Sequence, residues 1–143
     1  MKIHITLMAL LVIAGCTSVQ KDIASKTMRE AAPGTWTWKK GECTKDTQVY
    51  SFSDDEKAMY LYSKDGVVAN EKGDLEVDTV YQILDESRST IRTIIENEYR
   101  ETENGKPVVW DMNLINDNQF CWRRADWPRG ECTASMYRCD SAE

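Results

Sequence analysis

Few side chains in this sequence are suited to catalysis, and one absence reduces them further. The only histidine, His4, lies close to the N-terminus. The rest of the chain therefore lacks the usual general base near neutral pH, the Ser-His and Cys-His nucleophile pairs, and the commonest nitrogen ligand for metals. The 24 acidic residues still allow a carboxylate pair that includes Asp111. We nevertheless expect no enzyme, no cofactor and no metal site.

The N-terminal segment has the composition of an export signal. A single lysine gives it a positive start, and an apolar run follows over residues 5–13 that is too short to span a bilayer. The run leads into Ile13-Ala14-Gly15-Cys16. This motif resembles the lipobox of bacterial lipoproteins. The resemblance implies that Cys16 is linked to diacylglycerol, carries fatty acyl chains such as palmitate, and becomes the first mature residue. Ordinary secretion is the alternative.

Removal of the signal, residues 1–15, leaves 128 residues, enough for one domain with a modest core. Residues 16–33 are polar and predict a tether, and residues 34–143 predict the domain. The mature net charge is −7, which disfavours nucleic acid and anionic lipid as partners. We expect a monomer attached to the membrane only through its lipid. Thr17, where inner-membrane lipoproteins carry Asp, implies by the same resemblance the outer membrane of the cell envelope, facing the periplasm.

Four cysteines remain after Cys16: Cys43, Cys121, Cys132 and Cys139. An even number in an exported chain indicates two disulfides, with three connectivities allowed. The sequence contains no Cys-x-x-Cys pair, which argues against a metal site.

From residue 34 onward, short runs with period two alternate with turn residues, which predicts an all-β domain. Asn104-Gly105 is the strongest turn signal, because a type I′ turn needs positive φ at both central positions. Eight antiparallel segments with short connections predict a closed up-and-down barrel, and a two-sheet sandwich is the alternative. The expected strands cover residues 35–39, 47–53, 57–63, 77–85, 90–101, 108–115, 119–124 and 134–139.

Alternation assigns each strand an inward face. Over residues 108–115, Val108, Trp110, Met112 and Leu114 share one side, which we expect to face inward, while Asp111 faces outward. In the other strands the inward positions carry large apolar side chains. They are Trp36, Trp38, Tyr50, Phe52, Met59, Leu61, Ile91, Ile95 and Trp122.

Barrel closure favours one disulfide connectivity. If the last strand runs antiparallel beside the first, Cys132 at its start lies near Cys43 at the exit of the first. A hairpin around Pro128 places Cys121 within one position of Cys139, at a separation that a disulfide can bridge. We therefore expect the pairs Cys43–Cys132 and Cys121–Cys139.

Gly34-Thr35-Trp36 resembles the G-x-W motif that opens the first strand of lipocalins. The resemblance implies a barrel in which Trp36 closes one end beneath an arginine of the last strand, a position that Arg138 occupies. The second lipocalin motif, T-D-Y, is not present.

One hypothesis for function is a lipid-anchored, non-enzymatic envelope protein whose barrel binds a small apolar ligand. Ligand pockets are apolar cavities with few polar groups, and this chain has five Trp and six Tyr. A solid core formed by the same side chains is the alternative. The candidate ligand-binding residues are Trp36, Tyr50, Trp110, Met112 and Trp122.

A second hypothesis is a protein-binding periplasmic inhibitor or an immunity-type lipoprotein. Small disulfide-braced barrels with lipid anchors resemble membrane-bound lysozyme inhibitors in architecture, and an acidic surface suits a basic periplasmic protein. A structural role at the envelope also fits the sequence. The charged candidates for such a surface are Glu96, Glu98, Glu101, Glu103, Arg123, Arg124 and Arg129.

Overall fold

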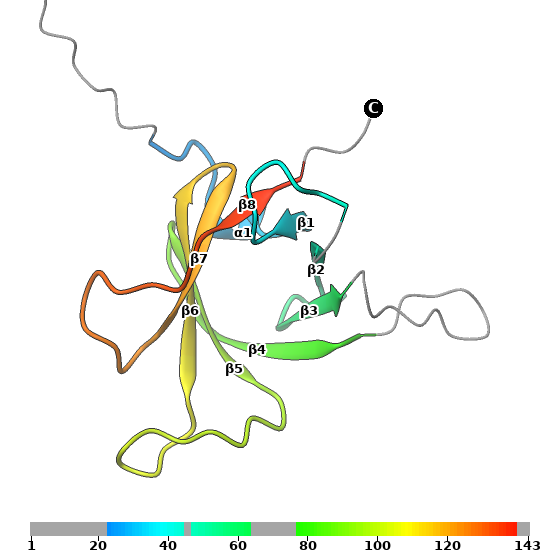
Figure 1. Ribbon diagram of the computed structural model, residues 1–143. Coiled ribbons are helices and arrows are strands. Elements are labelled where there is room, and N and C mark those ends of the chain that lie inside the picture. Colours follow the sequence, from blue (N-terminus) through cyan, green and yellow to red (C-terminus); the bar gives the residue numbers. More distant parts are fainter. Residues whose placement is uncertain (1–22, 45–46, 64–76, 140–143) are drawn as a thin grey trace, which may run out of the picture.

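Eight antiparallel strands form one sheet that closes on itself, which confirms the predicted up-and-down barrel (Figure 1). The strands are β1 (Gly34–Thr37), β2 (Thr47–Phe52), β3 (Ala58–Ser63), β4 (Thr79–Glu86), β5 (Thr90–Ile95), β6 (Val109–Asn116), β7 (Gln119–Arg124) and β8 (Met136–Arg138). Each strand pairs with the next along the chain. β8 closes the barrel against β1, with Trp36 opposite Arg138 and Thr37 opposite Tyr137. Closure removes the unpaired edges that an open sheet would present.

The computed structural model describes residues 23–44, 47–63 and 77–139. The expected export signal, with His4, Cys16 and Thr17, lies outside these residues. So does the connection between the strands expected at residues 57–63 and 77–85.

β5 is shorter than the sequence predicts. It ends at Ile95 rather than at residue 101, because Asn97 has a φ of 58° and the Glu98 N–H donates to the Ile95 carbonyl at 3.3 Å. A left-handed φ interrupts an extended strand, and Asn adopts it more readily than most residues. The segment after Ile95 is therefore a loop at the barrel mouth.

The turn at Asn104-Gly105 forms, but not as the predicted type I′ turn. Gly105 has a φ of 68°, whereas Asn104 is not among the residues with positive φ. The Gly105 N–H donates to the Thr102 carbonyl at 2.9 Å. One left-handed residue is therefore enough to reverse the chain here.

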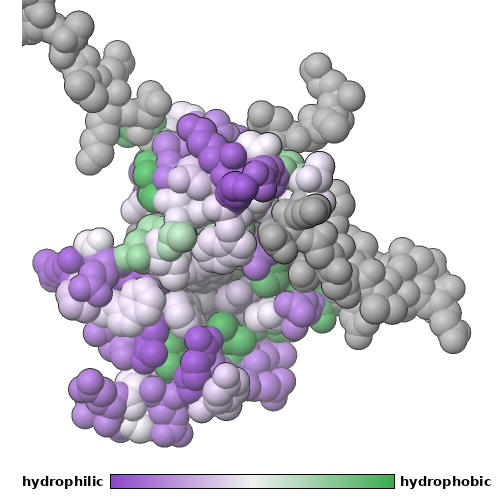
Figure 2. All heavy atoms as spheres, viewed as in Figure 1, coloured by the Kyte–Doolittle hydropathy of each residue, from purple (hydrophilic) through white to green (hydrophobic). Residues whose placement is uncertain are grey.

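The inward faces largely follow the predicted alternation. Trp36, Tyr50, Met59, Ile91 and Met112 are fully buried. Hydrophilic side chains predominate on the surface seen in Figure 2, where hydrophobic ones form only small separate groups. The large apolar side chains therefore lie mainly inside the barrel.

Trp38 is the main exception to the predicted inward set, with 39% of its surface exposed. It follows the last residue of β1 and stands at the rim of the barrel. Tyr81, Phe120 and Met136 were not in the predicted inward set, and all three are buried. The Phe120 ring packs edge-on against Trp36, with 4.6 Å between the ring centroids.

One short helix, α1 (Met28–Ala31), closes one end of the barrel. A helix of four residues has little stability of its own, so tertiary contacts must hold it. Thr27 and Glu30 form a capping box, and the Met28 N–H donates to the Arg88 carbonyl at 2.8 Å. Met28, Ala31 and Ala32 are fully buried. Residues 28–32, which the sequence placed in a tether, thus belong to the core.

The hairpins β2–β3, β4–β5 and β6–β7 surround α1 and define the closed end of the barrel. Arg29 forms an ion pair with Glu86, with its Nε 2.7 Å from Oε2, and the Lys26 N–H donates to Asp117 at 2.9 Å. The opposite end, which we call the open end, carries the loops that follow β1, β5 and β7.

Two disulfides form, as predicted, but with a connectivity other than the expected one. Cys43 pairs with Cys139 at a Cα separation of 5.7 Å, and Cys121 pairs with Cys132 at 5.9 Å. The predicted pairs Cys43–Cys132 and Cys121–Cys139 are therefore wrong.

Both differences come from loop conformations that strand alternation does not reveal. The Thr37 hydroxyl donates to the Glu42 carbonyl at 2.8 Å, so the loop after β1 folds back and brings Cys43 to the end of β8. β8 begins at residue 136 rather than 134, and the Thr133 N–H donates to the Trp122 carbonyl at 2.8 Å. The segment before β8 therefore stays against β7, and Cys132 in this segment forms its disulfide with Cys121 of β7.

Candidate functional site

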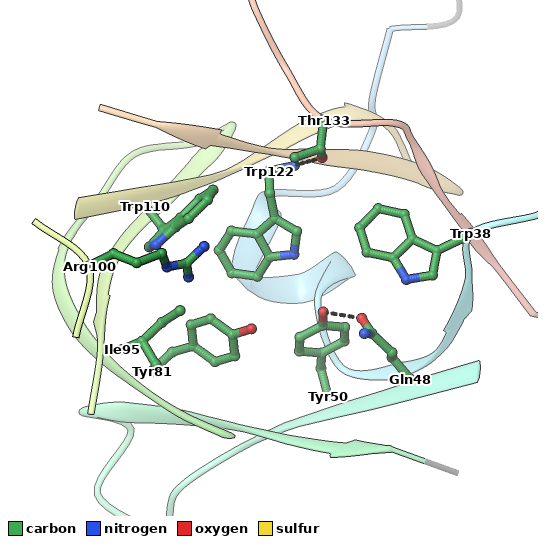
Figure 3. A pocket seen from close by; sticks show the side chains of 9 residues that line it. All are labelled: Trp38, Gln48, Tyr50, Tyr81, Ile95, Arg100, Trp110, Trp122 and Thr133. Carbon is green, nitrogen blue, oxygen red and sulfur yellow. Dashed lines mark hydrogen bonds between the residues drawn. The ribbon is translucent and has the colours of Figure 1, made fainter. Parts of the chain in front are cut away.

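A cavity of about 190 Å³ lies at the open end of the barrel (Figure 3). In this view α1 lies behind the cavity, at the far end of the barrel. Most of the wall is aromatic, and the strands and mouth loops bring the rings together. The aromatic residues are Trp38, Tyr50, Tyr81, Trp110 and Trp122, and the remaining ones are Gln48, Ile95, Arg100 and Thr133.

Three of the aromatic rings in the wall, those of Tyr50, Tyr81 and Trp122, are packed against one another, which fixes the shape of that part of the wall. Tyr81 and Trp122 stack with 4.9 Å between centroids and 15° between planes. Tyr50 lies tilted at 6.4 Å from each of them. Trp110 is supported from outside the cavity by the edge of Trp127 at 5.9 Å. Such contacts add about 0.5–1.5 kcal/mol per pair beyond area burial, so the wall is preorganised.

Two tyrosine hydroxyls provide neutral polar groups in this wall. Burial raises the pKa of both phenols, so each keeps its proton at neutral pH. The Tyr50 hydroxyl donates to Gln48 Oε1 at 2.7 Å. The Tyr81 hydroxyl points toward the middle of the cavity in Figure 3. An apolar wall with a few placed polar groups is the usual composition of a small-molecule site.

Among the described residues that line the cavity, Arg100 is the charged one, and Glu98 holds its side chain in place. Its Nε lies 2.7 Å from Glu98 Oε1 and its Nη2 lies 2.6 Å from Oε2, while its backbone N–H donates to Oε1 at 3.0 Å. Its guanidinium also lies over the Trp110 ring, 5.2 Å from the centroid. These contacts keep a long, flexible side chain at the cavity mouth.

The Glu98 carboxylate is strongly stabilised in its charged form. Only 6% of its side chain is exposed, and its hydrogen bonds with Arg100 lower its pKa to about 2, against the opposing effect of burial. The Trp110 indole N–H lies near the same carboxylate and also favours its charge, although its geometry falls short of a hydrogen bond. The pair is therefore ionised at neutral pH.

The structure brings three of the five candidate ligand-binding residues together. Tyr50, Trp110 and Trp122 line the cavity. Trp36 and Met112 do not, because they lie deeper in the barrel and are fully buried in its core. The barrel is therefore hollow toward its open end and solid toward its closed end.

Sequence reasoning did not identify Tyr81 and Arg100 as site residues. The same alternation that faces Ile83 inward also faces Tyr81 inward, so a signal for it was present in the strand expected over residues 77–85. No such signal was present for Arg100, because the sequence predicted a continuous strand over residues 90–101 and not the loop that brings Arg100 to the cavity.

Trp36 and Arg138 meet at the closed end, as the lipocalin resemblance implies. The Arg138 guanidinium carbon lies 4.4 Å from the Trp36 ring centroid, and its Nη1 donates to the Pro33 carbonyl at 3.2 Å. The Trp36 indole N–H donates to the Ala32 carbonyl at 2.9 Å. Together these contacts join β1, β8 and the segment after α1 into a floor below the cavity.

Asp111 lies on the outward side of β6, as alternation predicts, and yet it is buried. Arg92 Nε and Nη2 donate to its two oxygens at 2.7 and 3.0 Å, and Arg123 Nη1 lies 4.0 Å away. The two guanidinium groups cover the carboxylate on the outer wall, so it does not face the cavity. Its contacts brace β5, β6 and β7.

Several residues expected in a charged interaction surface are paired inside the domain. Glu98 is bound to Arg100, and Arg124 forms a two-point ion pair with Asp126 at 2.9 and 2.8 Å. Arg123 Nη2 donates to the Trp127 carbonyl at 3.3 Å. These groups support the mouth loops, and fewer of them are available to a partner than the sequence suggested.

Fold and site together define a small, disulfide-braced antiparallel barrel with an aromatic cavity at one end. No protein-family model, curated protein or solved structure matches this chain. Within residues 23–44, 47–63 and 77–139, no three His, Cys, Asp or Glu side chains are grouped to hold a metal. In that same part of the chain, no helix has both the length and the hydropathy to cross a membrane.

Proposed function

We propose that this chain is a lipid-anchored, non-enzymatic protein of the bacterial cell envelope whose barrel binds a small, planar, largely apolar ligand. The observation that carries the proposal is the aromatic cavity, open at one end and closed below by a packed core. Tyr81 and Trp122 both line this cavity, and their rings give it apolar aromatic surface.

The cavity volume limits the size of the ligand. Pockets for drug-sized molecules measure about 300–1,000 Å³, whereas an apolar cavity of about 150 Å³ holds benzene. At about 190 Å³ this cavity suits a single ring with a small substituent. A long acyl chain does not fit above the solid floor.

Two features of the chain support the envelope location. The lipobox resemblance implies an anchor at Cys16, and two disulfides are typical of proteins outside the cytoplasm. The described chain begins at Ile23 beside the closed end, only a few residues after Cys16. The anchor therefore favours an orientation with the closed end near the membrane and the cavity mouth directed away from it.

A cavity-filling substitution tests the binding proposal. Benzyl alcohol is expected to bind the full-length, oxidised protein saturably, with a change in tryptophan fluorescence. Ile95→Trp places a bulky side chain in the cavity and should abolish the signal at equal ligand concentration. Ile115→Trp is the matched control, because Ile115 is 44% exposed on the outside of the barrel and should leave binding unchanged.

Two results would contradict the proposal. One is no saturable binding of either benzyl alcohol or benzoate by the folded parent protein. The other is equal binding by a folded Ile95→Trp variant, which would place the ligand elsewhere.

A further inference from the structure

Arg100 uses only one edge of its guanidinium group within the domain. Glu98 occupies the edge formed by Nε and one N–H of Nη2. The other edge, formed by Nη1 and the second N–H of Nη2, makes no hydrogen bond within the described part of the chain. In Figure 3 the guanidinium extends from the mouth into the cavity, near Tyr81 and Trp122. The guanidinium group of Arg100 can therefore donate two hydrogen bonds to a ligand in the aromatic cavity.

The other polar groups of the cavity also favour an acceptor. The Tyr81 hydroxyl points into the space and makes no hydrogen bond with any described residue, so it can donate. The Tyr50 hydroxyl already donates to Gln48. Among the described residues that line the cavity, none is acidic. A cationic ligand would thus meet Arg100 without a carboxylate in the wall to balance its charge.

We infer that the ligand of this cavity is a small aromatic carboxylate, bound through its two oxygens by the free edge of Arg100 while its ring lies against Tyr81 and Trp122. This inference rests on the proposed ligand-binding function and specifies the ligand's chemical class. A guanidinium fork matches the geometry of a carboxylate, and a charged, two-point hydrogen bond is stronger than a neutral one.

Glu98 does not prevent this second carboxylate from binding. The two carboxylates would occupy adjacent edges of one planar guanidinium, so the ligand lies closer to Arg100 than to Glu98, and attraction exceeds repulsion. Glu98 also fixes the guanidinium in advance, which lowers the entropy lost on binding. The pair with Glu98 is thus a positioning contact, and the free edge is the binding one.

Three probes of similar size and different charge test the inference. Benzoate, benzyl alcohol and benzylamine are titrated into the oxidised, full-length protein by isothermal titration calorimetry. Benzoate is expected to bind at least about tenfold more tightly than benzyl alcohol, and benzylamine more weakly than both. Added salt should weaken only the benzoate complex appreciably.

A double variant tests the assignment to Arg100. Arg100→Gln alone would leave Glu98 buried without its partner and risk unfolding, so Glu98→Gln/Arg100→Gln removes both charges together. This variant should lose the parent's preference for benzoate over benzyl alcohol, because the two-point donor is gone. Arg124→Gln/Asp126→Asn is the matched control, because that pair has the same two-residue spacing and two-point geometry outside the cavity. It should keep the parent's preference.

The outcomes separate this inference from the function on which it rests. If benzyl alcohol binds as tightly as benzoate, or if the folded double variant keeps the benzoate preference, the carboxylate assignment is wrong and the binding function stands. If none of the three probes binds the parent, both are wrong.

Discussion

Glu98 holds a carboxylate almost out of water at the open end of the barrel, and its charge is linked to stability. Its pKa in the folded protein is about 2, below the ordinary value of 4.5, chiefly because of its hydrogen bonds with Arg100. A lowered pKa means that the folded state favours the charged form. The stabilisation is therefore fully present above about pH 4.5 and is lost as the pH falls toward 2.

Acid unfolding of Glu98→Gln tests this linkage. Between pH 5 and pH 2 the free energy of unfolding of the parent should fall by about 1–2 kcal/mol more than that of the variant. This value is smaller than the pKa shift alone would give, because Arg100 is half exposed and solvent screens the ion pair. Chemical unfolding at a series of pH values measures both curves, which should converge near pH 2. Glu103→Gln, on the exposed part of the same loop, should follow the parent. Parallel curves for parent and Glu98→Gln would refute the linkage.

The residues of the site differ in how far sequence could reveal them. Tyr50, Trp110 and Trp122 follow from strand alternation, because inward positions of a barrel are the ones that can line its interior. Alternation cannot tell a residue beside a cavity from one in a solid core, which is why Trp36 and Met112 were grouped with them. Arg100 depends on a loop conformation, and no periodic pattern encodes it.

Among the structural elements, β8 is the strand with the shortest pairings to its neighbours in the barrel wall, and one of them is its seam with β1. β8 has three residues, and its pairings with β1 and β7 each extend over two residue pairs. The Cys43–Cys139 disulfide and the contact of Arg138 with Trp36 reinforce this seam. The other disulfide, Cys121–Cys132, secures the loop between β7 and β8.

The two disulfides should contribute unequally to stability. The Cys43–Cys139 bridge joins residues 96 apart in sequence, and the Cys121–Cys132 bridge joins residues 11 apart. Loop-closure entropy then predicts that replacing both cysteines of the first pair with Ala costs about 2 kcal/mol more than the same change in the second. Urea unfolding of the two double variants measures the difference.

Hydrogen exchange supplies a local control for that comparison. Loss of the first bridge should accelerate exchange of the Cys139 amide position, whose N–H donates to the Thr35 carbonyl at 2.9 Å, and loss of the second should not. Equal losses of stability, or a larger loss for the second pair, would show that the seam does not depend on its disulfide.

The strands were predictable from sequence because alternation and turn residues act locally. All eight expected segments correspond to strands, and most bounds agree within a few residues. The disulfide connectivity was not predictable, because the loop after β1 folds back and the chain before β8 remains with β7. Helix α1 was also missed as a core element, since four residues give no periodic signal and only packing holds it.

At the scale of the whole molecule, the two ends of the barrel differ in structure. The closed end contains α1 and the floor formed by Trp36 and Arg138, close to the start of the described chain. The open end contains the aromatic cavity and the mouth loops. If Cys16 is the anchor, as we propose, this polarity would direct the cavity away from the membrane.

The central claim is that this barrel works outside the cytoplasm, anchored through Cys16 and braced by two disulfides. Intact mass spectrometry of the full-length chain, recovered from bacterial membranes and measured before and after reduction, tests it most directly. We predict a protein that begins at Cys16, carries the mass of its acyl groups, and gains four hydrogen atoms on reduction of its two disulfides. An uncleaved chain without acyl groups, whose five cysteine thiols all react before reduction, would contradict the account.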